Sequence, residues 1–302
     1  MFSEAIEFFV YDSVKILLLL LVINYIMAAV RYYLPLEKIR EFLHSRKWYG
    51  ADYLLGAFFG AITPFCSCSS IPLFVGFLGA GIPVGVTFTF LITSPLINEA
   101  AIALFIGLFG WKVTLMYVGA GLALGILGGL ILSKTNVKKY INPDILQTAN
   151  HVSMNTAPQR ASISKKNLLK LWFKESLAFT KKLALYVLAG VAVGAIIHGY
   201  VPQNFFEGTL INNAWWTVPL AALVAVPLYS NAVGVIPIMQ ALVIKGVPIG
   251  TALAFMMATV GLSFPEALIL KKIMKLKLLA IYFGIVTVGI IVIGYVLNIF
   301  FG

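Results

Sequence analysis

The chain contains two cysteines, Cys66 and Cys68, inside the run Thr63-Pro-Phe-Cys-Ser-Cys-Ser-Ser-Ile-Pro72. Prolines bracket the run, and we expect a break here because proline removes a helical hydrogen bond. Thiolates are soft ligands that select thiophilic partners. Two of them on one short loop suit an acceptor with two open positions, such as a trivalent organoarsenical carrying one carbon. The alternatives are packing, for which a small apolar thiol is well suited, or structural zinc, which would need about four ligands and is not expected.

Uncharged polar side chains accompany this run and two other places in the chain. A second proline-bracketed run, Pro227-Leu-Tyr-Ser-Asn-Ala-Val-Gly-Val-Ile-Pro237, lies in the other half, and Pro95 interrupts the apolar run 84–108. The polar groups could line a solute path, or they could only satisfy backbone groups that the prolines leave without partners. The candidate path-lining residues are Ser67, Ser69, Ser70, Ser94, Asn98, Ser230 and Asn231.

Two carboxylates, Glu99 and Glu266, lie at similar places in the two halves of the chain. An ionised group at the centre of a membrane costs at least about 2.5–3.5 kcal/mol, so such a residue is a functional candidate. We interpret both as candidates for proton coupling, with a hydrogen-bonded structural carboxyl as the alternative. Glu266 is five residues from Lys271 and could form an interfacial ion pair instead. We therefore expect Glu99→Gln to impair coupling more than Glu266→Gln.

The composition predicts an all-α polytopic membrane protein. Hydrophobic residues make up 61% of the 302 positions and charged residues 11%, against roughly 45–50% and about 25% in soluble domains. A soluble protein of this composition would expose large apolar patches. A spanning helix needs about 20 apolar residues, and such runs occur at 14–30, 84–108, 113–132, 183–197 and 278–300.

The net charge of +11 does not indicate nucleic-acid binding, because of where the cations lie. All but three of the 22 Lys and Arg fall in the blocks 31–47, 134–182 and 271–277, between apolar runs. Cytoplasmic loops carry an excess of Lys and Arg, so we expect these blocks in the cytoplasm and both termini outside it. The even number of crossings between blocks then favours re-entrant broken hairpins at 51–81 and 214–246. Two full spans in place of each hairpin would give the same parity.

The two halves share a sequence pattern. Ile71-Pro72 followed by Gly81-Ile-Pro-Val-Gly85 matches Ile236-Pro237 followed by Gly246-Val-Pro-Ile-Gly250, with 11 residues between the prolines in both halves. Paired broken segments of this kind are typical of secondary transporters. We expect two inverted-topology repeats, each with one spanning helix, one re-entrant broken hairpin and two more spanning helices. The expected boundaries are 1–133 for the first membrane repeat, 134–178 for a cytoplasmic basic linker and 179–302 for the second membrane repeat.

The motifs around the cysteines resemble those of a known family. The run 63–72, with Gly81-Ile-Pro-Val-Gly85 and Thr93-Ser-Pro-Leu-Ile-Asn-Glu-Ala100, is similar to the predicted-permease family that includes the organoarsenical efflux permeases of the ArsP type. The resemblance covers most of the chain from about Ala51, excluding the linker, and is less specific for substrate than for family. It implies an inner-membrane exporter of trivalent organoarsenicals with Cys66 and Cys68 as thiol ligands.

The sequence favours a secondary-active exporter of soft, thiol-reactive solutes and not an enzyme. The chain lacks a nucleotide-binding motif, so ATP could drive transport only through a partner. A passive channel or an importer of another small solute is the first alternative. A membrane thiol-redox enzyme is the second, although it would favour Cys-x-x-Cys spacing. We expect a small-molecule substrate, a lipid bilayer and protons as partners, with no cofactor and no nucleic acid; a homo-oligomer is compatible with the sequence.

Overall fold

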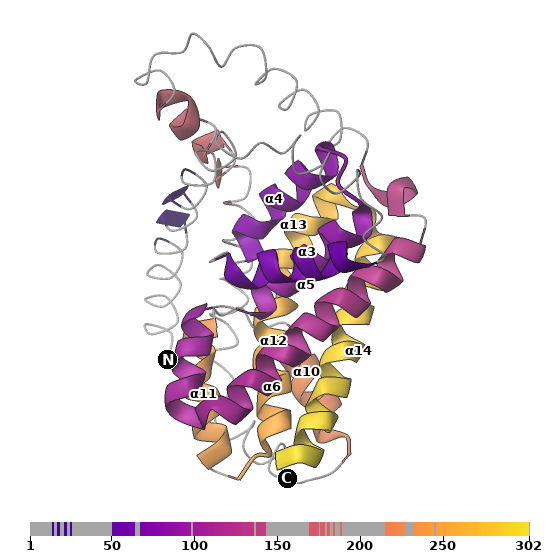
Figure 1. Cartoon of the computed structure of the whole chain (residues 1–302). Coiled ribbons are helices and arrows are strands. Elements are labelled where there is room, and N and C mark those ends of the chain that lie inside the picture. Colours follow the sequence, from indigo (N-terminus) through magenta and orange to yellow (C-terminus); the bar gives the residue numbers. More distant parts are fainter. Residues whose placement is uncertain are drawn as a thin grey trace.

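The computed structural model describes residues 50–63, 67–97, 99–135, 137–142, 215–226, 232–244 and 246–301, with scattered positions in 14–25 and 169–188. Throughout these segments the regular structure is helical, apart from a bridge between Ile141 and Met274. The elements shown in Figure 1 are α3 (Ala51–Ile62), α4 (Ser67–Gly79), α5 (Val84–Leu96), α6 (Glu99–Lys134), the 3-10 helix η1 (Val137–Tyr140), α10 (Thr217–Ala225), α11 (Ala232–Ile244), α12 (Ile249–Gly261), α13 (Phe264–Ile273) and α14 (Leu276–Phe301).

Two of these helices are long and apolar enough to cross a bilayer, which takes about 20 residues. They are Ala101–Lys134 within α6, with a mean hydropathy of 2.1, and α14, with a mean hydropathy of 2.5. α12 and α13 pass the same test as a pair and are bent by 48° at the break between them. The described part of the chain thus holds two or three membrane-length elements, and the predicted all-α, multi-pass membrane protein is confirmed at this level.

Each proline-bracketed run lies between two short helices, the second of which begins inside the run and contains its second proline. These helices are α3 and α4 at the first run, with 12 and 13 residues, and α10 and α11 at the second, with 9 and 13 residues. At about 1.5 Å per residue, each helix is no longer than about 20 Å, and a hydrocarbon core is about 30 Å thick. None of these four helices therefore reaches across a bilayer by itself.

The apolar run 84–108, which we predicted as one helix, is divided in the structure. α5 ends at Leu96, Ile97 is extended (φ −117°, ψ 114°), and α6 begins at Glu99. Pro95 has no N–H, so the last turn of α5 already lacks one helical hydrogen bond. α6 itself departs from helical geometry at Gly110, whose φ of 78° glycine adopts at little cost. The first membrane half consequently contains one more interruption than the hydropathy pattern indicated.

α5 and α12 are the central helices of the two halves. Every residue of α5 from Gly85 to Leu96 is buried, and so is nearly all of α12. Helices that are apolar on all sides belong in the interior, and both are surrounded accordingly. α3, α4 and α6 pack on α5, while α10, α11 and α14 pack on α12.

The segments that lead into α5 and α12 have the same local geometry. α4 and α11 both end in a turn whose glycine has a positive φ, 78° at Gly81 and 96° at Gly246. In both turns the hydrogen bonds are those of a Schellman motif, in which glycine is favoured after the last helical residue. Pro83 and Pro248 follow at the N-caps of α5 and α12, with ψ values of 129° and 139°. The matched Gly-x-Pro motifs in the sequence therefore encode matched helix junctions.

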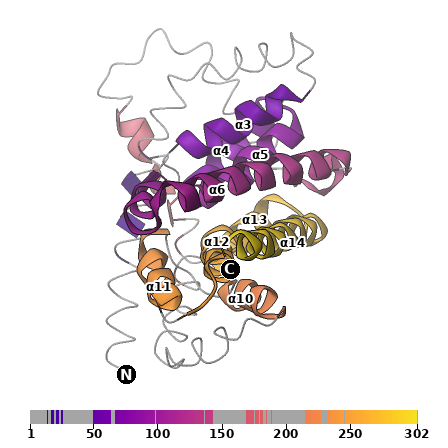
Figure 2. The ribbon, with the colours of Figure 1, turned by 60° about the horizontal axis from the view of Figure 1, so that its bottom comes forward.

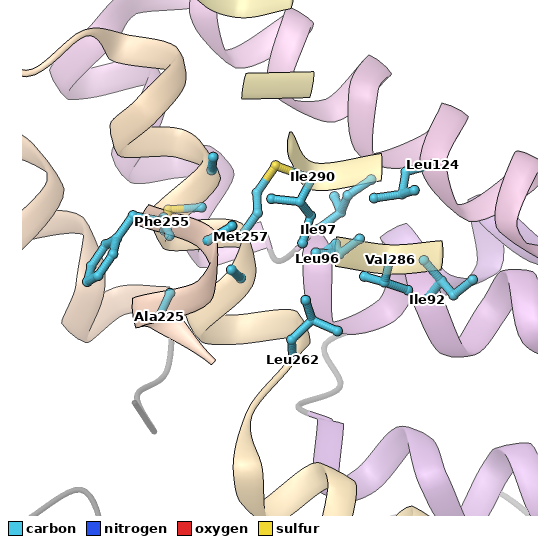
Figure 3. Packing of buried hydrophobic residues seen from close by; sticks show 14 of the residues in the cluster. Ile92, Leu96, Ile97, Leu124, Ala225, Phe255, Met257, Leu262, Val286 and Ile290 are labelled. Atoms are coloured by element: carbon cyan, nitrogen blue, oxygen red, sulfur yellow. The ribbon is translucent and has the colours of Figure 1, made fainter. Parts of the chain in front are cut away.

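The helices of the two halves lie side by side in Figure 2, with α3 to α6 on one side and α10 to α14 on the other. The core between them is apolar: Ile92 and Leu96 of α5 lie near Val286 and Ile290 of α14 and Leu262 beyond α12 (Figure 3). Four helix pairs cross between the halves, α5 with α12, α6 with α14, α6 with α11, and α4 with α13. In the last two pairs, a helix that carries a glutamate in its first turn packs against the proline-containing helix of the other half.

Candidate functional site

The structure describes the predicted site residues unevenly. Cys66, Asn98, Ser230 and Asn231 lie outside the described residues. For four others the backbone alone is described: Ser67, Cys68 and Ser69 form the first turn of α4, and Glu99 is the first residue of α6. The side chains of Ser70, Ser94 and Glu266 are all buried, with exposed fractions of 0%, 0% and 1%.

The helix break that precedes Cys66 begins at Thr63. This residue ends α3 in an extended conformation (ψ 125°), and its hydroxyl donates to the Phe59 carbonyl at 2.7 Å. The helix resumes at Ser67, and Pro72 lies inside α4. Because Pro72 has no N–H, the Cys68 carbonyl loses the helical hydrogen bond that it would otherwise accept. A backbone acceptor without a helical partner therefore lies on the same residue as one of the two thiols.

The break before Glu99 is held by a tyrosine of α6. The Tyr117 hydroxyl donates a hydrogen bond to the carbonyl of Leu96, the last residue of α5. The Tyr117 ring is fully buried and stacks on Phe105, with 4.9 Å between the ring centroids and 7° between the planes. Carbonyls at a helix end have no intrahelical partner, and Tyr117 supplies one for Leu96.

The break between α12 and α13 has a polar lining of a different kind. Leu262 leaves the helical region (φ −135°, ψ 35°), and Ser263 is the N-cap of α13. The sequence Ser263-Phe-Pro-Glu266 fits the capping-box pattern, in which the serine and glutamate side chains bond the first backbone N–H groups. Ser263 makes no such cap bond, and its buried hydroxyl has no hydrogen-bond partner among the described residues. The capping box is therefore open.

Glu266 is buried on α13, which packs on α14. The side chain is 1% exposed, while Lys271 is exposed at the other end of α13. The carboxyl lies beside the hydroxyl of Tyr282, a fully buried residue of α14, without a hydrogen bond of ordinary geometry between them. Its position in the first turn of α13 also favours a negative charge, because the helix dipole is positive there.

Sequence reasoning missed Tyr282 and Ser263 as members of this site. A usable signal was present in the chain. The bounds of α11 follow those of α4 by 165 positions, and the bounds of α12 follow those of α5 by the same offset. Applied to Tyr117, this offset gives Tyr282, so two tyrosines at matched positions face the two breaks.

Comparisons with known proteins place the chain among membrane permeases. The UPF0718 protein MJ0584 of Methanocaldococcus jannaschii is 23% identical over 92% of this chain and 92% of its own length. The UPF0718 protein YraQ of Escherichia coli K12 is 24% identical over 80% of this chain and 66% of its own length. No solved structure matches the chain. The family model described as predicted permease, ArsP_1, matches residues 1–299, and the chain therefore belongs to the predicted permease family.

Proposed function

We propose that this permease is a secondary-active exporter of soft, thiol-reactive solutes, with trivalent organoarsenicals as the substrate class. The observation that carries the proposal is the pair of cysteines at the break between α3 and α4, in a chain of the predicted permease family. Membership of a permease family favours a transporter over a thiol-redox enzyme. Non-helical backbone at membrane depth is stable only where protein or a water-filled cavity covers it, which suits a solute site.

The proposed binding step is exchange of oxygen for sulfur at arsenic. In a hydrated organoarsenical, RAs(OH)2, the two As–O bonds break and two As–S bonds to Cys66 and Cys68 form. Each thiol proton leaves with a hydroxide as water, and no atom changes oxidation state. Thiolate ligands suit this soft centre. The path on either side of the thiols would be lined by Ser67, Ser69, Ser70, Asn98, Ser230 and Asn231.

The architecture that fits this function is a pair of inverted repeats, 1–133 and 179–302, around a cytoplasmic linker at 134–178. The matched bounds of α4 with α11 and of α5 with α12 support a duplication. The short lengths of α3, α4, α10 and α11 favour re-entrant broken hairpins over pairs of full spans. The distribution of Lys and Arg favours an inner-membrane orientation with both termini outside the cytoplasm.

Protons are the proposed coupling ion, with Glu99 and Glu266 as the carboxyls that carry them. Both residues lie in the first turn of a helix that follows a break. A buried carboxyl is costly when charged, so its protonation state is linked to whether the surrounding helices admit water. Export in exchange for protons would load such a carboxyl from outside and release its proton to the cytoplasm.

The test is uptake of trivalent methylarsenical by everted membrane vesicles, with and without an imposed proton gradient. Wild-type vesicles should accumulate the solute, and a gradient that is acidic inside should accelerate uptake. The Cys66→Ser/Cys68→Ser double variant should lose this uptake at an equal amount of protein, because serine keeps the size of the side chain and removes the soft ligand. Uptake by the double variant at the wild-type rate would exclude the thiols from the site. Equilibration that ignores the gradient would replace the exporter with a passive channel.

A further inference from the structure

The serine half of the capping box at the start of α13 is open, because the buried Ser263 hydroxyl makes no cap bond. Ser263, Glu266 and Tyr282 are exposed by 1%, 1% and 0%, so none of the three is solvated by bulk water. In a closed capping box the Glu266 side chain would turn back toward the backbone N–H of Ser263. It interacts instead with the Tyr282 hydroxyl, on the neighbouring helix α14. The two residues thus meet between α13 and α14.

A tyrosine hydroxyl is suited to a carboxyl that changes its protonation state. It donates a hydrogen bond to a carboxylate and accepts one from a protonated carboxyl, whereas an amide N–H could serve only the carboxylate. In the structure the Tyr282 hydroxyl completes no hydrogen bond of ordinary geometry with a described residue, although it interacts with Glu266. The hydroxyl is therefore able to turn toward either form of the carboxyl.

The matched tyrosine of the first half provides an internal comparison. Tyr117 occupies the position that corresponds to Tyr282, and its hydroxyl is committed to the Leu96 carbonyl. The position that corresponds to Glu266 is Ala101, which has no ionisable group. Among the described side chains, it is in the second half that the buried tyrosine is combined with a buried carboxyl. This difference distinguishes a tyrosine that holds a helix end from one that faces a proton acceptor.

Direct packing connects this pair to the helix that carries Cys68. α13, which holds Glu266, packs on α4. The Tyr282 ring lies 6.1 Å from that of Phe88 on α5, and the Phe88 ring lies edge-on to Phe74 of α4 at 5.0 Å. A change in the charge of Glu266 would consequently act on the elements that position the cysteine-bearing turn.

We propose that Glu266 and Tyr282 form a buried proton-binding pair, in which Tyr282 is a positioning residue that sets the pH at which the Glu266 carboxyl takes up its proton. This inference rests on the proposed function, because the proton bound by the pair is taken to be the ion that drives export. Protonation neutralises the carboxylate and turns it from an acceptor into a donor toward Tyr282. The contact between α13 and α4 relays this change to the thiol site.

Within the described part of the chain, few other titratable groups lie on the elements around the pair. α5 and α12 contain none. The groups on the elements packed against α13, and on α13 itself, are Cys68 on α4, Lys271 and Lys272 on α13, and Lys277, Tyr282 and Tyr295 on α14. The three lysines are exposed to solvent, whereas Tyr282 is fully buried.

The experiment is a pH titration of the purified full-length protein in lipid nanodiscs, followed through the infrared band of protonated carboxyl groups. A band that is present in wild type and absent from Glu266→Gln belongs to Glu266. Tyr282→Phe removes a donor to the carboxylate, so the midpoint of this band should move to higher pH by about one unit. Tyr117→Phe is the matched control, since it removes an equally buried hydroxyl and should leave the midpoint unchanged. Vesicle uptake measured against pH should shift in Tyr282→Phe by the same amount.

A titrating Glu266 band whose midpoint moves in Tyr282→Phe and not in Tyr117→Phe would establish the pair, even if uptake proved insensitive to a proton gradient. In that case the coupling proposal would fail and the proton site would stand. A spectrum without a Glu266 band between pH 4 and 10, or a midpoint that Tyr282→Phe leaves in place, would overturn the inference whatever the vesicles show. If Tyr282→Phe does not fold, Glu266→Asp provides the test, because it keeps the tyrosine and should also move the midpoint of the carboxyl band.

Discussion

Replacement of Gly129 by alanine should destabilise the contact between α6 and α5. Gly121, Gly125 and Gly129 recur at a spacing of four and all face α5. A Cβ at Gly129 would lie 2.6 Å from the Gly85 carbonyl oxygen and still closer to the Thr89 hydroxyl, which itself donates to that carbonyl at 3.0 Å. The carbonyl is backbone of a buried helix and cannot turn away, so the two helices must separate.

Overpacking costs typically 1–3 kcal/mol, and alanine returns about 0.5–1 kcal/mol through its higher helix propensity. The net loss is then at most about 2.5 kcal/mol and centred near 1 kcal/mol, which is a decrease of ~2 °C in Tm for a chain of this size. The assay is thermal unfolding of the purified protein in detergent. Gly119→Ala is the control in the same helix, because nothing lies within 4 Å of its added Cβ; its Tm should be unchanged or slightly higher. Equal Tm values for Gly129→Ala and Gly119→Ala would refute the packing argument.

Three further predictions concern function and topology. Cys66→Ser and Cys68→Ser should each abolish resistance of cells to trivalent organoarsenicals at normal protein level; full resistance in the double variant would make the thiols packing residues. Glu99→Gln and Glu266→Gln should both weaken the response of vesicle uptake to a pH gradient, with Glu99→Gln the more severe as expected from the sequence; a full response in both would leave the carboxyls structural. Single cysteines placed in 136–167 of a Cys66→Ser/Cys68→Ser background should react with impermeant reagents only from the cytoplasmic face, and labelling from outside would contradict the proposed inverted topology.

The breaks in the helices could be predicted from the sequence where proline or glycine causes them. The first interruption begins at Thr63 as expected, but α4 starts at Ser67 and continues through Pro72. The Gly-x-Pro motifs at Gly81 and Gly246 mark helix ends in the structure. These features are local, because proline removes a donor and glycine admits a positive φ wherever they occur. Gly110 lies in the gap between the predicted runs 84–108 and 113–132. Pro95 was expected to disturb the run 84–108, but the complete end of α5 at Leu96 was not predicted, since hydropathy stays high across Ile97 and carries no information on backbone direction.

The position of Glu266 could not be predicted because it depends on how α13 is turned. Its sequence distance to Lys271 left an interfacial ion pair as an alternative to proton coupling. Residues five apart on a helix are separated by about 140° around its axis, so one can face the protein interior while the other faces solvent. The packing of α13 on α4 and α14 decides which, and those contacts join segments that are far apart in the chain. Tyr282 was missed for the same reason, as it lies in an apolar helix with no local motif.

If the halves are duplicates, the chemistry is divided between them. The offset of 165 positions pairs Cys66 with Asn231 and Cys68 with Val233, so the second half lacks both thiols. The same offset pairs Glu266 with Ala101, so the carboxyl at this matched position occurs in the second half. The two chemistries nevertheless meet, because α13 of the second half packs on α4 of the first. Duplication followed by specialisation would in this way place a soft ligand site and a proton site in contact across the boundary between the repeats, which is what coupling of one to the other requires.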